Sequence, residues 1–135
     1  MRTIKGGLVV LLFCSLVVFV FVSPDFAQGN NSGFVLPPDP GKAGKKTLLG
    51  IDTDGDGVRD DIQRYIYLTY PDDKKLRLGL TYYAIEFQGV LKDANDREAA
   101  YDHANKMARH GECLWYLKGE ESIDICNALR AKILN

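Results

Sequence analysis

The sequence predicts a small all-α domain of about four short helices, opened by an aspartate-rich loop at the start of the first helix. After Gly57, apolar residues recur every three or four positions, the spacing of amphipathic helices. In no stretch do apolar and polar residues alternate convincingly with period two, so we expect no substantial sheet. Pro71 and Gly119 stand where such helices should stop. The expected organisation is an N-terminal segment (1–29), an arm (30–50) and a helical domain (51–135).

The first 29 residues have the pattern of a secretory signal. Arg2 and Lys5 precede 15 uncharged residues, from Leu8 to Val22, which match the basic and apolar regions of such a signal. The run is shorter than the roughly 20 residues that usually span a membrane. Cleavage after Gly29 would give a secreted or periplasmic protein. The alternative is an uncleaved anchor formed by residues 8–22, with the domain facing the exterior.

Residues 30–50 form a segment rich in Gly, Pro and Ser, without a sustained period. Such composition is typical of a linker or extended arm, partly of polyproline type. The apolar residues Leu48, Leu49 and Ile51 at its end are expected to dock on the domain. The formal net charge of -1 gives no broad basic surface, so we expect no nucleic-acid partner.

Four helices are expected in order along the domain. The first carries Ile62, Tyr65, Ile66 and either Thr69 or Tyr70 on one face and stops at Pro71. Pro71 suits the first turn of the second helix, beside Asp72 and Asp73. The apolar stripe of that second helix consists of Leu76, Leu80, Tyr83, Phe87 and Leu91.

The third helix is expected to begin at Asn95, which forms a capping-box pattern with Glu98. Gly119 should end it, and Ser122 should cap the last helix. The residues expected to face inward are Tyr101, Ala104, Met107 and Ala108 on the third helix and Ile125, Cys126, Leu129 and Ile133 on the fourth.

The segment Asp52–Gln63 reads DTDGDGVRDDIQ and holds five carboxylates within ten residues. These charges repel one another unless a hard cation joins them, and calcium takes six to eight oxygen ligands. Gly57 is sixth from Asp52, where calcium loops turn sharply. The alternative is a solvated acidic turn without an ion. The predicted calcium ligands are Asp52, Asp54, Asp56, the carbonyl of Val58, Asp60 directly or through water, and Asp61, which is otherwise a helix cap.

These residues resemble the calcium loops of thrombospondin type 3 repeats and of dockerin and EF-hand relatives. An EF-hand has a bidentate Glu at position twelve and an apolar residue at position eight, where this chain has Gln63 and Arg59. With Val58 at position seven, the pattern is closer to the thrombospondin type. The resemblance implies one structural loop of weak affinity, about 10⁻⁴–10⁻³ M, rather than a paired calcium sensor.

A wider resemblance covers PPDPGKAGKKTLLGIDTDGDGVRDDIQRYI and the following LTYP. This stretch is similar to a group of small exported bacterial proteins of unassigned function. They share the proline-rich arm and the aspartate loop. The resemblance implies a class of protein and no particular activity.

Two cysteines, Cys113 and Cys126, remain once the signal carrying Cys14 is removed. An even pair in an exported chain predicts a disulfide. It would close a loop of 14 residues and add about 3 kcal/mol of stability. The alternative is two buried free thiols.

The leading functional hypothesis is a calcium-stabilised exported domain with a binding or accessory role, without evident catalytic machinery, and with a protein or envelope partner. One rival is a small calcium-assisted hydrolase that uses His103 or His110. Another is a structural envelope protein tethered by its N-terminus. Tyr67, Tyr82 and Trp115 lie off the main apolar stripes. They form either a recognition surface or further packing contacts.

Overall fold

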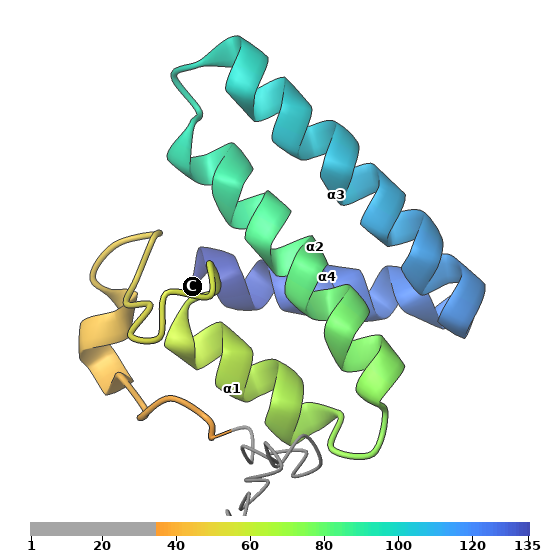
Figure 1. The fold of residues 1–135 in the computed structure, drawn as a ribbon, viewed down its shortest axis with the longest axis horizontal. Coiled ribbons are helices and arrows are strands. Elements are labelled where there is room, and N and C mark those ends of the chain that lie inside the picture. Colours follow the sequence, from red (N-terminus) through yellow and green to blue (C-terminus); the bar gives the residue numbers. More distant parts are fainter. Residues whose placement is uncertain (1–34) are drawn as a thin grey trace, which may run out of the picture. The chain divides into compact units, whose positions relative to one another are not determined.

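The computed structural model describes residues 35–135, so the predicted signal lies outside the described residues. The described part contains four α-helices and one short 3-10 helix, and no strand (Figure 1). The predicted all-α class is therefore confirmed. No helix of this part is long and apolar enough to cross a membrane. The elements are η1 (Gly41–Lys45), α1 (Asp60–Thr69), α2 (Lys74–Lys92), α3 (Arg97–Lys118) and α4 (Glu121–Leu134).

Helices α2 and α3 form an antiparallel hairpin, and α4 runs across this hairpin near its end (Figure 1). Helix α1 packs against α2 and α4. The core lies where these helices meet. Its buried apolar residues are Val58, Ile62, Ile66, Leu76, Leu80, Tyr83, Ala84, Leu114, Ile125, Cys126, Leu129 and Ile133.

Helix α3 contributes a single buried residue, Leu114. The expected inward face is therefore only partly correct, since Tyr101 is 69% exposed and Ala108 is exposed, while Met107 is half-buried. The hairpin reaches beyond α4 (Figure 1). Only α2 covers the first half of α3, so side chains with helical spacing there remain in water.

The helix ends differ from the expected ones by a few residues. Asp73 caps α2 by accepting the N–H of Leu76 at 2.9 Å, so Pro71 lies in the preceding turn. Asp96, not Asn95, caps α3. Gly119 ends α3 as predicted, with φ of 59°, a conformation that costs glycine little. Ser122 lies inside α4, where its hydroxyl donates to the carbonyl of Gly119 at 2.6 Å.

The predicted disulfide is not formed. Cys113 is an exposed free thiol and Cys126 a buried one. Cys126 shares a hollow with Trp115 of α3, whereas Cys113 lines a different groove beside Leu78. The side chains of residues two positions apart in a helix, such as Cys113 and Trp115, point in directions about 200° apart. Cys113 therefore points away from the face of α3 that meets α4.

Candidate metal centre

The acidic loop leads from the arm into α1. Its ends are drawn together by the N–H of Asp60, which donates to the carbonyl of Ile51 at 2.8 Å. Gly55 and Gly57 have φ of 71° and 89°, which side-chain-bearing residues rarely adopt. The sharp turn therefore occurs at the sixth position, where the calcium-loop pattern requires it.

Three carboxylates of the loop converge. Asp52, Asp54 and Asp60 each place an oxygen within 4.8 Å of the others. Calcium–oxygen bonds of about 2.3–2.6 Å allow ligands on opposite sides of one ion to be roughly 5 Å apart. The spacing therefore suits three ligands of a single ion. Asp60 is buried, whereas Asp52 and Asp54 are exposed.

Gln63, at the twelfth position, joins two of the acids. Its Nε2 donates to Asp56 Oδ2 at 2.5 Å and to Asp54 Oδ2 at 3.2 Å. The side chain is 2% exposed, and its Oε1 is buried with no hydrogen-bond partner among the described residues. Unsatisfied buried carbonyls are uncommon in folded proteins. Half a turn of the terminal amide exchanges the two atoms, and Oε1 then faces the acids.

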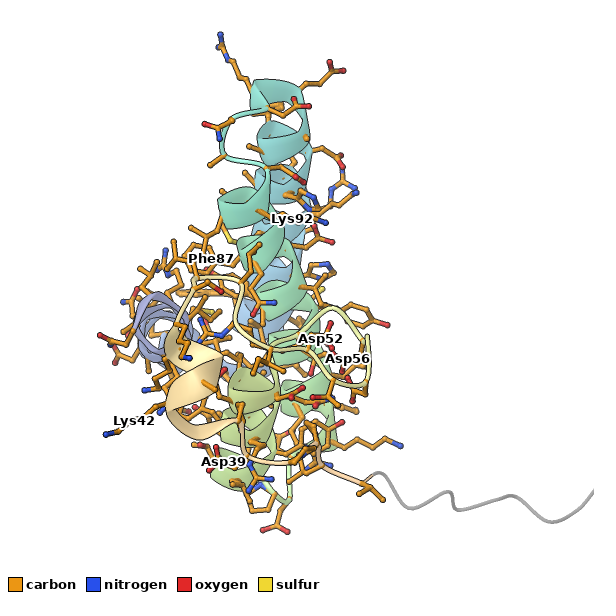
Figure 2. All side chains as sticks on the ribbon, turned by 90° about the vertical axis from the view of Figure 1, so that its left-hand side faces the viewer. Asp39, Lys42, Asp52, Asp56, Phe87 and Lys92 are labelled. Atoms are coloured by element: carbon orange, nitrogen blue, oxygen red, sulfur yellow. The ribbon has the colours of Figure 1, made fainter. Side chains whose placement is uncertain are left out.

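Backbone and hydroxyl donors hold the carboxylates in place. Asp52 accepts the N–H groups of Gly55 at 2.8 Å and Gly57 at 3.0 Å. Asp60 accepts the N–H and the hydroxyl of Thr53 at 2.8 and 2.5 Å. These donors position the carboxylate oxygens, but they do not remove the repulsion between the negative charges of the carboxylates. Figure 2 shows Asp52 and Asp56 beside each other in this loop.

The pKa of Asp56 is affected by the crowding of carboxylates in the loop. Partial burial raises the pKa of this carboxyl, and the N–H of Val58, which it accepts at 2.8 Å, opposes the rise. The neighbouring charges of Asp54, Asp52 and Asp60 raise the pKa further. A cation among these groups would reverse the effect, because it favours the charged form of each acid.

Val58 and Asp61 serve the fold in ways that the loop pattern did not indicate. The side chain of Val58 is fully buried in the core. Asp61 binds Arg59 through both oxygens, to Nε at 3.0 Å and to Nη2 at 2.8 Å. Asp61 is therefore a structural partner of Arg59 and does not belong to the three-carboxylate cluster.

Arg59 is the residue that sequence reasoning missed. It is 1% exposed, and its Nη1 donates to the carbonyls of Leu48 at 3.1 Å and Ile133 at 2.7 Å. It thus ties the arm and the end of α4 to the loop. The signal in the sequence was a cationic side chain among the aspartates of a short motif. Its carbonyl partners lie far away in the sequence, so they could not be predicted from the motif.

Gln88 fastens the loop to α2. Its Nε2 donates to the carbonyl of Gly57 at 2.9 Å, and its Oε1 accepts the N–H of Arg59 at 3.3 Å. The loop therefore contacts the arm, α2 and α4 at once. An ion that orders the loop would consequently stabilise the junction of all three.

The two histidines have separate surroundings. His103 lies between Glu86 of α2 and Asp93, the residue that follows the end of α2, with Nδ1 2.6 Å from Glu86 and Nε2 3.3 Å from Asp93. It also lines a hollow of about 380 Å³ that includes Asp52. His110 stacks on Tyr82, with ring centroids 5.4 Å apart. The hydrolase hypothesis named either histidine, and each now has its own neighbours; a catalytic role of either stays a prediction.

Among the aromatic residues expected to form either a surface or packing contacts, Tyr67 packs against the core. Arg77 lies over the Tyr67 ring at 4.9 Å from its centroid. Tyr82 and Trp115 are 47% and 50% exposed. Recognition by these two rings stays a prediction.

The contact between α2 and α3 at His103 leads to a stability prediction. A Cβ at Gly89 would lie 2.5 Å from Nδ1 of His103, whereas a Cβ at Gly111 would meet only Tyr83 at 3.9 Å. We expect Gly89→Ala to destabilise the protein by about 1–3 kcal/mol through overpacking. Gly111→Ala should stabilise it by about 0.5–1 kcal/mol. Urea unfolding followed by circular dichroism measures both, and equal effects would contradict this packing.

Comparison of the chain with protein-family models, with curated proteins and with solved structures finds no match. The likeness of the loop to thrombospondin type 3 and EF-hand loops therefore stays a prediction from its residues.

Proposed function

We propose that the chain is an exported helical domain that binds one calcium ion in the loop Asp52–Gln63, with a structural role for the ion in a binding or accessory protein. The observation that carries the proposal is the convergence of three carboxylates within 4.8 Å next to a buried amide oxygen without a partner. The basic and apolar pattern of residues 1–29 supports export.

The donor set favours a hard cation. The aspartates that meet in the loop offer oxygen, and the Gln63 amide, whose Nε2 now donates to Asp54 and Asp56, would offer oxygen after half a turn. No histidine or cysteine belongs to the cluster, so the ligands that zinc and copper prefer are missing from it. Asp52, Asp54, Asp60 and Gln63 are the residues that would hold the ion, with Asp56 adjacent. Calcium accepts such an irregular group more readily than magnesium, which demands octahedral geometry.

The position of the loop supports a structural role. Arg59 and Gln88 connect it to the arm, α2 and α4. A bound ion would lock this junction, since it replaces repulsion among the acids by attraction. The cluster also lies largely at the surface, where Asp52 and Asp54 are exposed, so calcium can enter without opening the core.

Calorimetric titration of the full chain with calcium tests the proposal. We expect one site with a dissociation constant of about 10⁻⁴–10⁻³ M. Asp54→Asn should weaken binding at least about tenfold, because it removes a charged ligand. Asp72→Asn, an exposed aspartate outside the loop, is the matched control and should bind like the natural protein. Equal binding by both variants would refute the site.

Gln63 provides a separate prediction. We expect Gln63→Glu to tighten calcium binding roughly tenfold, because it supplies the acidic twelfth ligand of EF-hand loops. Gln63→Leu should weaken binding, because it removes the amide oxygen and keeps a buried side chain of similar size. The same titration measures both variants. Unchanged affinity in Gln63→Leu would show that the amide is not a ligand.

A further inference from the structure

A hollow separate from the acidic loop lies between η1, α1 and α4. These elements enclose a hollow of about 560 Å³, within the usual size range of small-molecule sites. Four cationic side chains line it: Lys42, Lys45, Arg64 and Lys132. Figure 2 shows Lys42 on the arm, away from Asp52 and Asp56 of the calcium loop, so the hollow is distinct from the metal centre.

Positive charges outnumber negative charges in the lining of this hollow. Its lining includes two carboxylates, Asp39 and Asp61. Asp61 is already paired with Arg59, and Asp39 accepts the N–H of Gly41 at 2.9 Å. The ion pairs of the described residues include none of the four cations. Asp39 keeps its negative charge, but four cations against two carboxylates leave the hollow with an excess of positive charge for an anion.

Two of the cations are held in place. Arg64 donates from Nη1 to the carbonyl of Pro37 at 2.9 Å, which leaves most of its five N–H donors unused. Lys132 places its Nζ 5.6 Å from the centroid of the Tyr65 ring. Both side chains are half-buried. Because their rotamers are already restricted, less entropy is lost when a ligand binds.

We propose that this hollow binds a phosphate-bearing anion. The planar fork of arginine matches phosphate oxygens, and lysines add point charges around it. A phosphate monoester carries about −1.5 to −2 charges near pH 7 and uses the excess positive charge better than a single carboxylate does. Tyr65 and Leu68 line the same hollow and provide an apolar wall for the rest of the ligand.

The test uses the full chain with chelator present, so that the calcium site does not contribute. Glycerol phosphate is titrated by calorimetry, and vesicles of phosphatidylglycerol are compared with vesicles of phosphatidylcholine by cosedimentation. The double variant Arg64→Gln/Lys132→Gln removes two charges from the hollow. The matched control, Lys74→Gln/Arg109→Gln, removes the same two residue types from exposed positions elsewhere.

We expect the double variant to weaken phosphate binding at least about tenfold, which corresponds to the loss of charge-assisted contacts, while the control stays unchanged. Lys45→Gln is a milder variant at an exposed position and should weaken binding with the fold intact by circular dichroism. A loss seen with glycerol phosphate indicates a soluble ligand, and a loss seen only with vesicles indicates a lipid headgroup. No saturable binding of either phosphate source, or equal losses in variant and control, would overturn the proposal.

Discussion

Replacement of Arg59 by alanine should lower the free energy of unfolding by about 3–5 kcal/mol, the cost of breaking a buried ion pair from one side. Arg59 is 1% exposed. Its loss leaves Asp61 without its bidentate partner and the carbonyls of Leu48 and Ile133 without this donor. Urea unfolding followed by far-ultraviolet circular dichroism measures the change.

Two further variants make this result specific. Arg59→Lys keeps the charge but loses the guanidinium fork, so we expect an intermediate loss. Arg109→Ala on the exposed face of α3 should change the stability by no more than about 0.5 kcal/mol. If Arg59→Ala cost less than about 1 kcal/mol, the junction of arm, loop and α4 would not depend on this side chain.

Calcium should raise the melting temperature of the protein. At a calcium concentration ten times the dissociation constant, binding to the folded state adds about 1.4 kcal/mol. For a domain of this size that corresponds to roughly 6–11 °C. Thermal unfolding with calcium and with chelator, monitored by circular dichroism, measures the shift.

The double variant Asp52→Asn/Asp54→Asn separates ion binding from a simple change in charge. It should abolish the calcium-dependent shift, because it removes two members of the three-carboxylate cluster. Without calcium it should melt above the natural protein, because fewer like charges then lie close together. A melting temperature that is insensitive to chelator in the natural protein would contradict a structural ion.

Most of the fold could be predicted because helical periodicity is a local signal. Ile62 and Ile66 of α1 and Leu76, Leu80 and Tyr83 of α2 are buried as their spacing indicates. The prediction failed where burial depends on the neighbours of a helix. Tyr101 has helical spacing but lies on the part of α3 that only α2 covers.

Part of the candidate metal site could also be predicted from the sequence. Alternate aspartates and a glycine at the turn are local features, and they bring Asp52 and Asp54 together with Asp60. The contacts that join the loop to the rest of the domain could not be predicted from the sequence. Arg59 reaches a carbonyl 74 positions away, and Gln88 reaches the loop from α2 across 31 positions. Such partners follow from the packing of the helices and not from the loop pattern.

The disulfide prediction failed for a related reason. Compartment and cysteine number indicate whether a bond can form, but not where each thiol points. Cys113 and Trp115 lie on opposite sides of α3, and it is the Trp115 side that meets Cys126. A rotation of about 200° between two helical positions thus decides the outcome.

The most direct test of the calcium proposal is a crystal structure of the protein grown with calcium and measured at a wavelength where calcium scatters anomalously. We expect one anomalous peak in the loop, with oxygens of Asp52, Asp54 and Asp60 at about 2.3–2.6 Å from it and the Gln63 amide turned to present Oε1. A crystal saturated with calcium that shows no peak among these oxygens would contradict the proposal.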